Sequence, residues 1–253
     1  MDTQMIQQQI CAVICRHKGI KARDIARELE LSHQTVNHVL YSSPLMKELC
    51  WQDQEYSWHG IIRQEVPHLG LQEFAGYYGT VKEFLSMNEE TWLIELCEGC
   101  RNIGRNLNDN RGLIHSFRDC RNQLFHLFQD LKEMECDDFL DWEIAFEFRL
   151  KRSRFVRIYA DVLVITDKYI FSMEFKMKDR IDPDEIQQSA KYVPYLEIVF
   201  GSEYQVIPVL VLTTSHDLFQ YSQIGRKGSN VHICSGDMLF NVFNDYFDFL
   251  SND

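Results

Sequence analysis

Four short runs of β-branched and aromatic residues in the second half of the chain constrain its fold most. They are WEIAFEFRL, ADVLVITD, YIFSMEFKM and VIPVLVLT, all within residues 142–213, and such runs predict strands. Between the third and fourth, DPDEIQQSAKYVPYLEIVF predicts a helix, with Asp182 as its cap, Pro183 at its first position and Glu185 at its third. A crossover helix between strands predicts an α/β (α+β) fold with a mixed sheet flanked by helices. The tail DMLFNVFNDYFDFL predicts a final amphipathic helix.

The first 60 residues predict three helices followed by a β-hairpin. Apolar residues recur at helical spacing in IQQQICAVICRH, KARDIARELELS and HQTVNHVLYSS, and Ser32 is a cap for the third helix. Two short runs around Trp51 and Trp58 follow, with Asp53 between them. This order predicts a small winged helix-turn-helix domain over residues 1–60.

Residues 61–140 predict mainly helices, one of them capped by Thr80 or Asn88. We expect this segment to be a helical linker, or the first helical layer of a third part that spans 141–253 and contains the strands. Cys97 and Cys100 fall in the helical pattern, so buried thiols are expected there in preference to a zinc site.

The net charge of −12 argues against nucleic-acid binding when taken alone, because phosphate contacts need Lys and Arg. The charge is unevenly distributed, however. From Arg149 to Arg180 there are nine basic and four acidic residues. Arg154 and Arg157 in this segment are expected to contact a nucleic acid. The alternative is a solvated strand edge guarded by basic side chains.

The cysteines and the hydropathy pattern bear on the compartment. The chain has 8 cysteines and no secretory signal, which predicts free thiols in a reducing cytoplasm. It has no run of about 18 apolar residues, so no membrane span is expected.

Two acids interrupt the predicted strands at places where apolar residues dominate. Asp161 opens one strand and Glu174 lies near the end of the next. If these strands pair as a hairpin that turns between Asp167 and Lys168, Glu174 falls opposite Asp161, about 5 Å away at Cβ. Two carboxylates that close need a cation, and oxygen ligands suit Mg²⁺ or Mn²⁺.

Lys176 follows Glu174 at a spacing of two, so both side chains point to the same face of the sheet. Two carboxylates that hold a metal beside an ammonium predict phosphodiester hydrolysis, because the metal activates water and the cations stabilise developing negative charge. The alternative is a structural salt-bridge cluster of Asp161, Glu174 and Lys176 at the end of the sheet.

Asp161 followed by Glu174-Phe175-Lys176 resembles the PD-(D/E)XK nuclease superfamily, whose fold is restriction-endonuclease-like. The predicted helix adds Gln188 and Tyr192, which match a Gln-x-x-x-Tyr pattern found in many members. The proline that usually precedes the Asp is replaced by Ala160.

The resemblance implies a role for each matching residue. Asp161 and Glu174 would bind the metal, Lys176 would serve catalysis, and Gln188 and Tyr192 would contact the substrate or position the site. A further acid often completes the metal site, and Glu147 and Glu133 are the two candidates.

The stretch VNHVLYS and the later YSW resemble the Z-alpha winged helix and bacterial winged helix-turn-helix domains. The resemblance implies nucleic-acid contacts by Asn37, Tyr41 and Trp58. The chain departs from the Z-alpha pattern at His33, where that family has lysine, and in its acidic wing. The alternative is a winged helix used for protein contacts.

Together these features predict a cytoplasmic, Mg²⁺- or Mn²⁺-dependent nuclease that cuts DNA. The assembly resembles restriction or phage-defence nucleases, and the acidic surface points to a helicase or ATPase partner, or to a homodimer. The alternative is a non-catalytic winged-helix adaptor whose degenerate nuclease-like domain only binds nucleic acid or protein.

Overall fold

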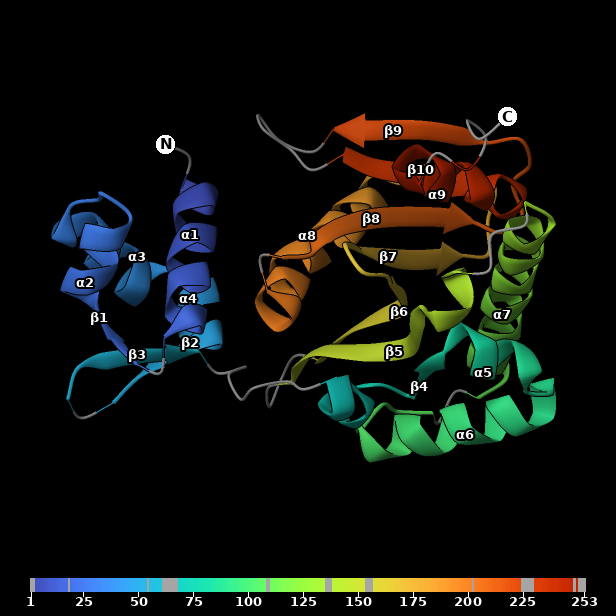
Figure 1. Cartoon of the computed structure of the whole chain (residues 1–253), viewed down its shortest axis with the longest axis horizontal. Helices are drawn as coiled ribbons and strands as arrows, with labels where there is room; N and C mark the ends of the chain where they lie inside the picture. Colours follow the sequence, from blue (N-terminus) through green and yellow to red (C-terminus); the bar gives the residue numbers. More distant parts are fainter. Residues whose placement is uncertain are drawn as a thin grey trace. The chain divides into compact units, whose positions relative to one another are not determined.

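The structure of the chain is a computed structural model, and it contains two compact units (Figure 1). It describes residues 3–17, 19–53, 55–60, 68–107, 110–134, 138–152, 157–201, 203–223, 230–247 and 249. One unit comprises residues 1–67 with 194–203, and the other comprises 68–193 with 204–253. No helix in those described ranges is long and apolar enough to cross a membrane.

The N-terminal unit combines helices with a small antiparallel sheet of order β1-β3-β2. Its elements are α1 (Thr3–Arg16), β1 (Ile20–Lys21), α2 (Ala22–Glu28), α3 (His33–Ser42), α4 (Pro44–Leu49), β2 (Cys50–Gln52) and β3 (Ser57–Gly60). The expected three helices and hairpin are present, and Ser32 caps α3 by accepting a hydrogen bond from the Thr35 N–H. The short helix α4 is an addition that the sequence pattern did not indicate.

The larger unit is built on a seven-stranded mixed sheet of order β4-β5-β6-β7-β8-β10-β9. The strands are β4 (Tyr77–Thr80), β5 (Glu143–Arg152), β6 (Arg157–Ile165), β7 (Tyr169–Lys176), β8 (Gln205–Leu212), β9 (Phe219–Gln223) and β10 (Asn230–Ser235). The pairs β5–β6 and β6–β7 are antiparallel, whereas β7–β8 and β8–β10 are parallel. The prediction of a mixed α/β sheet with helices is confirmed.

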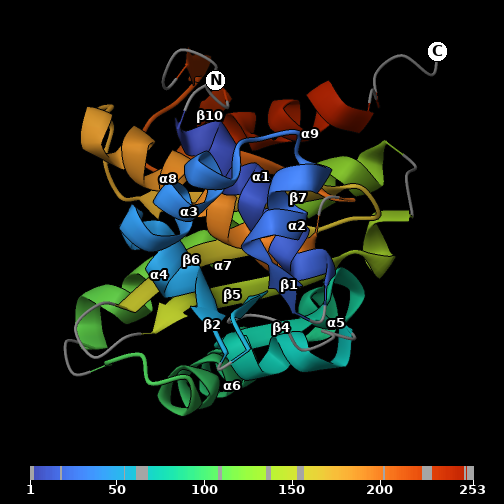
Figure 2. The same cartoon turned by 90° about the vertical axis from the view of Figure 1, so that its left-hand side faces the viewer.

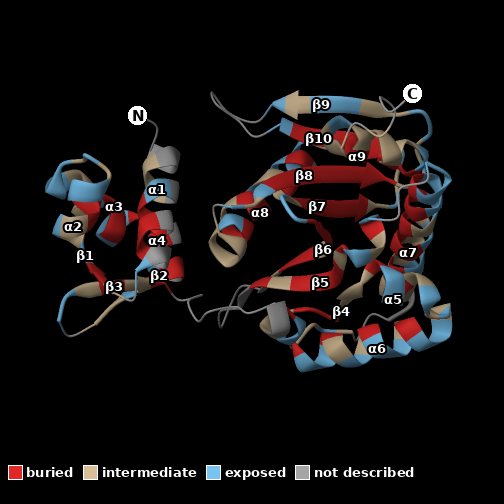
Figure 3. Ribbon diagram, viewed as in Figure 1, coloured by how far each residue is buried: buried red, intermediate tan, exposed pale blue. Residues whose placement is uncertain are grey.

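The helix α8 (Pro183–Phe200) makes the crossover from β7 to β8, as its start signals indicated. Asp182 precedes it and accepts a backbone hydrogen bond from the Asp184 N–H at its side chain. Ile186 of this helix packs with Leu210 and Leu212 of β8 on one face of the sheet. The strands β7 and β8 are buried along almost their whole length, as expected for strands covered on both faces (Figure 3).

The opposite face of the sheet carries the main core. Helices α5 (Val81–Ser86), α6 (Glu89–Asn102), α7 (Asn110–Glu133) and α9 (Leu239–Phe247) contribute to it, as do two short 3₁₀ turns, Asp138–Asp141 and Gly236–Met238. A third 3₁₀ turn, His68–Phe74, precedes β4 in the same unit. Phe84, Trp92, Phe128, Phe146 and Phe243 are among its fully buried aromatic side chains. Residues 68–134 therefore share one compact unit with the strands.

Strand β4 joins this helical segment to the sheet. It pairs with β5, Tyr77 lying opposite Phe146, and Figures 1 and 2 both show α5 and α6 beside it at one edge of the sheet. Thr80 ends β4 and begins α5 with a capping box, since its hydroxyl accepts from the Glu83 N–H and Glu83 accepts from the Thr80 N–H. Asn88 caps α6 in a similar way.

Candidate active site

Three adjacent strands of the sheet bring three acids together. Glu147 lies on β5, Asp161 on β6 and Glu174 on β7. The β6–β7 ladder runs from Ile165–Ile170 to Val162–Met173, so its next position sets Asp161 against Glu174. This is the register expected for a turn between residues 167 and 168. The order of the strands makes Asp161 the middle member of the three.

The Glu174 carboxylate is buried, with only one of its oxygens hydrogen-bonded. Oε1 accepts from Lys176 Nζ at 2.7 Å and from Gln188 Nε2 at 2.6 Å. Oε2 is buried without a hydrogen-bond partner in the described residues. Burial, with the charge of Asp161, raises the pKa of Glu174 to about 8 although Lys176 opposes the shift.

Asp161 is partly buried, and its carboxylate binds the main chain of β7 just beyond the last paired position, Val162–Met173. Its Oδ2 accepts from the Phe175 N–H at 3.0 Å. Burial raises the pKa of Asp161, and the charge of Lys176, the Phe175 N–H and the charge of Arg105 oppose that rise. Asp161 is therefore the carboxylate on which both neighbouring cations act.

The helix α8 supplies the polar residues that hold Glu174 in place. Gln188 Nε2 donates to the Tyr192 hydroxyl at 2.6 Å as well as to Glu174, and Tyr192 is buried. The structure thus brings together Asp161, Glu174, Lys176, Gln188 and Tyr192 from two strands and one helix. Tyr192 follows Gln188 at a spacing of four, so both lie on the face of α8 that meets the sheet.

Glu147 has an unusual backbone and a close cation. Its φ is 52°, a left-handed conformation that costs a non-glycine residue about 1–3 kcal/mol. Its buried carboxylate forms an ion pair with Arg105, Nε lying 2.7 Å from Oε2. Burial and the charge of Asp161 raise the pKa of Glu147 to about 7, against the effect of Arg105.

The other acid named for the metal site, Glu133, is exposed at the C-terminal end of α7. A different acid of the same helix was missed. Asp119 has a buried Oδ2 without a hydrogen-bond partner in the described residues. Burial and the charges of Asp161 and Asp119 all raise the pKa of the Cys120 thiol, so both carboxylates lie near that thiol. No motif marks Asp119 in the sequence, and only the packing of α7 places it near the candidate site.

No group of three or more His, Cys, Asp or Glu side chains in the described ranges is arranged to hold one metal ion. Two cations already contact the acids, Arg105 at Glu147 and Lys176 at Glu174. The donor chemistry nevertheless fits a hard cation, because a buried carboxylate oxygen without a donor, such as Glu174 Oε2, is costly unless a cation or water binds it.

The residues expected to bind nucleic acid in the N-terminal unit differ in exposure. Tyr41 is half exposed and Asn37 is partly buried, with its amide near the His33 ring. Trp58 is buried, its ring against that of Tyr41 at a centroid distance of 5.2 Å. In the larger unit, Arg154 lies outside the described residues.

Arg157 begins β6, opposite Arg152 of β5. Arg157 and Arg152 therefore lie on the pair of strands that carries Glu147 and Asp161.

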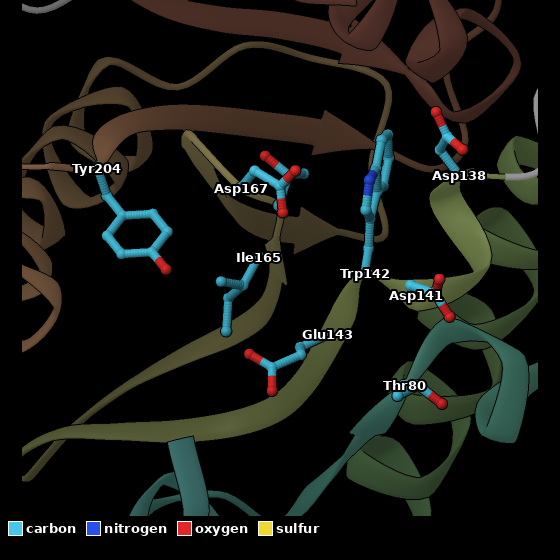
Figure 4. Close-up of a pocket in the computed structure, with 9 residues that line it drawn as sticks. Thr80, Asp138, Asp141, Trp142, Glu143, Ile165, Asp167 and Tyr204 are labelled. Atoms are coloured by element: carbon cyan, nitrogen blue, oxygen red, sulfur yellow. The ribbon is translucent and has the colours of Figure 1, made fainter. Parts of the chain in front are cut away.

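A pocket of about 560 Å³ lies at the other end of β5 and β6 (Figure 4). Asp138, Asp141, Glu143 and Asp167 line it, with Trp142 and Tyr204 among its remaining wall residues. Four carboxylates repel a phosphate backbone, so this pocket does not suit a nucleic acid.

Comparison with known proteins assigns no family. No family model and no curated protein matches the chain. Among solved structures, the chain is similar to the protein VC1899 from Vibrio cholerae, with 10% identity and a TM-score of 0.29. The match covers 99% of this chain and 54% of that one, so the chain spans about half the length of this neighbour. A similarity at this level carries no argument about fold or function.

Proposed function

We propose that the chain is a metal-dependent nuclease that hydrolyses phosphodiester bonds of DNA. The observation that carries the proposal is the state of Glu174. Its buried carboxylate accepts hydrogen bonds from Lys176 and Gln188 at Oε1, whereas Oε2, buried as well, has no hydrogen-bond donor among the residues that the structure describes. Asp161 lies opposite it on the neighbouring strand. A salt-bridge cluster that served stability alone would be expected to use both oxygens.

Asp161 and Glu174 are the residues that would hold Mg²⁺ or Mn²⁺, with Glu147 or Asp119 as a further oxygen ligand. Such an ion supplies an activated water and a positive charge at the scissile phosphate. Burial raises the pKa values of Glu174 and Glu147, and a bound cation would favour their ionised forms.

The remaining side chains of the site would orient the water and the phosphate, or hold Glu174 in place. Lys176 Nζ uses one N–H on Glu174 and has no further hydrogen-bond partner within the described ranges, so two donors would serve an attacking water or a phosphate oxygen. Gln188 fixes Glu174 Oε1, and Tyr192 in turn fixes Gln188. The roles are those that the PD-(D/E)XK resemblance implies.

The order of elements supports the same reading. A helix (α7), three antiparallel strands (β5, β6 and β7), a crossover helix (α8) and a parallel strand (β8) follow one another in the chain. We propose that this is a restriction-endonuclease-like core, and that the N-terminal unit is a winged helix whose exposed Tyr41, with Asn37, contacts DNA.

A role in phage defence, a cytoplasmic location and an ATPase, helicase or second-copy partner extend this proposal by analogy with nucleases of this kind. The strongly acidic chain makes a partner useful, because a net charge of −12 opposes unaided approach to DNA.

Cleavage of supercoiled and linear DNA by the purified protein with Mg²⁺ or Mn²⁺ tests the proposal. Lys176→Met removes the ammonium while Glu174 is still able to protonate, so the fold survives and cleavage falls by about 10²-fold or more. Lys168→Met, at an exposed lysine in the β6–β7 turn, is the matched control and keeps full activity. DNA binding without cutting, and without stabilisation by Mn²⁺, would favour the non-catalytic adaptor.

A further inference from the structure

The C-terminal end of α6 places one arginine at the candidate site. Gly104 follows the helix with φ of 76°, its N–H donating to the Arg101 carbonyl oxygen. The Arg105 N–H donates to the Cys100 carbonyl oxygen at 2.8 Å. These two bonds form a Schellman motif, which fixes the direction in which the chain leaves a helix. Arg105 is therefore held by main-chain geometry as well as by its side chain.

The Arg105 guanidinium forms a bridge from a buried carboxylate to solvent. It approaches Glu147 with Nε at 2.7 Å from Oε2 and Nη2 at 3.4 Å from Oε1. Its Cζ lies 4.8 Å from the centre of the Tyr159 ring, which supports one face of the planar group. Nη1 has no partner within the described part of the chain, so its two N–H donors remain for a ligand.

Lys176 forms an ion pair with buried Glu174, as Arg105 does with buried Glu147. The Arg105 side chain is 31% exposed and that of its partner Glu147 is 4% exposed. The Lys176 side chain is 25% exposed and that of Glu174 is 3% exposed. The anions are thus sealed and the cations reach the surface. Both cations act on Asp161, which lies on the strand between those of Glu147 and Glu174.

We propose that Arg105 binds a phosphate oxygen of the DNA backbone, so that the phosphodiester is held between Arg105 and Lys176 above Asp161. Arg105 would be a substrate-binding residue of the nuclease site. This inference rests on the proposed function for the identity of the ligand. The guanidinium pairs with Glu147 through Nε and Nη2, and the two N–H donors of Nη1 are the ones that would bind the phosphate oxygen.

The salt dependence of DNA binding tests this contact without any need for cleavage. The affinity for a short duplex is measured in EDTA at several salt concentrations, for the wild type and for three variants. Glu147→Gln leaves Arg105 without its anion, so we expect tighter binding, by about threefold or more. Arg105→Met combined with Glu147→Gln leaves no buried charge unpaired and is expected to fold.

Relative to Glu147→Gln alone, the double variant is expected to bind more weakly and to lose about one unit of the log–log salt slope. Arg101→Met, at an exposed arginine one turn earlier on α6, is the control and keeps the wild-type slope. Melting curves of all variants confirm that each one is folded.

Parallel cleavage assays with Mn²⁺ separate the two proposals. Equal salt slopes for Glu147→Gln and the double variant would show that Arg105 only neutralises Glu147, and would overturn the inference even if the wild type cuts DNA. A wild type that binds but never cuts, with the expected loss of slope, would overturn the nuclease and leave the phosphate contact standing. A wild type that neither binds nor cuts overturns both.

Discussion

Gly99 of α6 lies so close to Gly76 that a Cβ added at Gly99 would stand 1.9 Å from the Gly76 carbonyl oxygen. The Gly76 N–H donates to the Phe146 carbonyl oxygen, next to Glu147 in β5. This close approach of two main chains sets the distance between α6 and the strand that carries Glu147. It also sets where Arg105, at the end of α6, meets that carboxylate.

We therefore expect Gly99→Ala to destabilise the protein by about 1–3 kcal/mol or more, because a backbone oxygen is in the way. DNA cleavage should fall further than the loss of folded protein explains, since Arg105 and Glu147 move apart. Gly112→Ala in α7 is the control. A Cβ there meets nothing within 4 Å, and the change should stabilise by about 0.5–1 kcal/mol. Urea unfolding of both variants measures the difference.

Glu174→Gln should abolish cleavage and, at alkaline pH, increase stability. The pKa of Glu174 is raised to about 8 by burial, so the folded protein binds this proton more tightly than the unfolded chain does. Wild-type stability should consequently fall as pH rises from about 4.5 towards 8, and the variant should lack this contribution. Unfolding at pH 5 and pH 8.5 measures it, and we expect the variant to gain roughly 1–3 kcal/mol relative to the wild type between the two.

The stability of the protein in acid should depend on His232, in β10 next to the edge strand β9. This side chain is buried in β10, with Nε2 at 2.8 Å from the Tyr246 hydroxyl and Nδ1 at 4.0 Å from Asp245 Oδ2. Tyr221 donates a hydrogen bond to Asp245, and its ring packs against the His232 ring. Burial lowers the pKa of His232 from its usual 6.5, against the opposing charge of Asp245.

The unfolded chain therefore binds this proton more tightly than the folded protein does, and the contribution of His232 to stability is lost as pH falls below about 6.5. His232→Gln should reduce the loss of stability between pH 7 and pH 5, measured by thermal unfolding. An equal loss in both proteins would show that His232 takes up its proton without penalty. The carboxylates with raised pKa values act in the opposite direction, but they are common to both proteins and cancel in the comparison.

Tyr41 and Trp58 should separate binding from stability in the N-terminal unit. Trp58 is buried against Tyr41, so Trp58→Ala should cost about 3–5 kcal/mol of stability there. Tyr41 is half exposed, and Tyr41→Ala should cost far less stability while it weakens DNA binding by about 1–3 kcal/mol. Undiminished DNA affinity in Tyr41→Ala would assign this surface to protein contacts.

The strongly patterned elements were readable in the sequence because local signals and tertiary packing agree there. The runs that became β5, β6, β7 and β8 are apolar and β-branched, and α8 carries a clear start signal. The register of the β6–β7 hairpin followed from its short turn alone. Gln188 and Lys176 were found because their spacings within one element decide which face they share.

Elements whose partners are distant in the sequence were missed. β4 has only the residues YYGT, and these form a strand because they pair with β5. β9 and β10 are short and mixed in polarity, and pair with each other and with β8. Arg105 and Asp119 escaped notice for the same reason, since neither lies in a motif and only packing brings them near Asp161.

The pairing of β4 with β5 also affects how the chain acquires its structure during synthesis. β4 ends at Thr80, whereas its partner begins at Glu143, after α5, α6 and α7. A ribosome that has made β4 must complete three helices before it makes β5, the strand to which β4 is hydrogen-bonded. The pairing of β4 with β5 therefore joins residues that are far apart in the sequence. A nascent chain paused between these two points would expose an unpaired strand, and this interval is where chaperone protection would matter most.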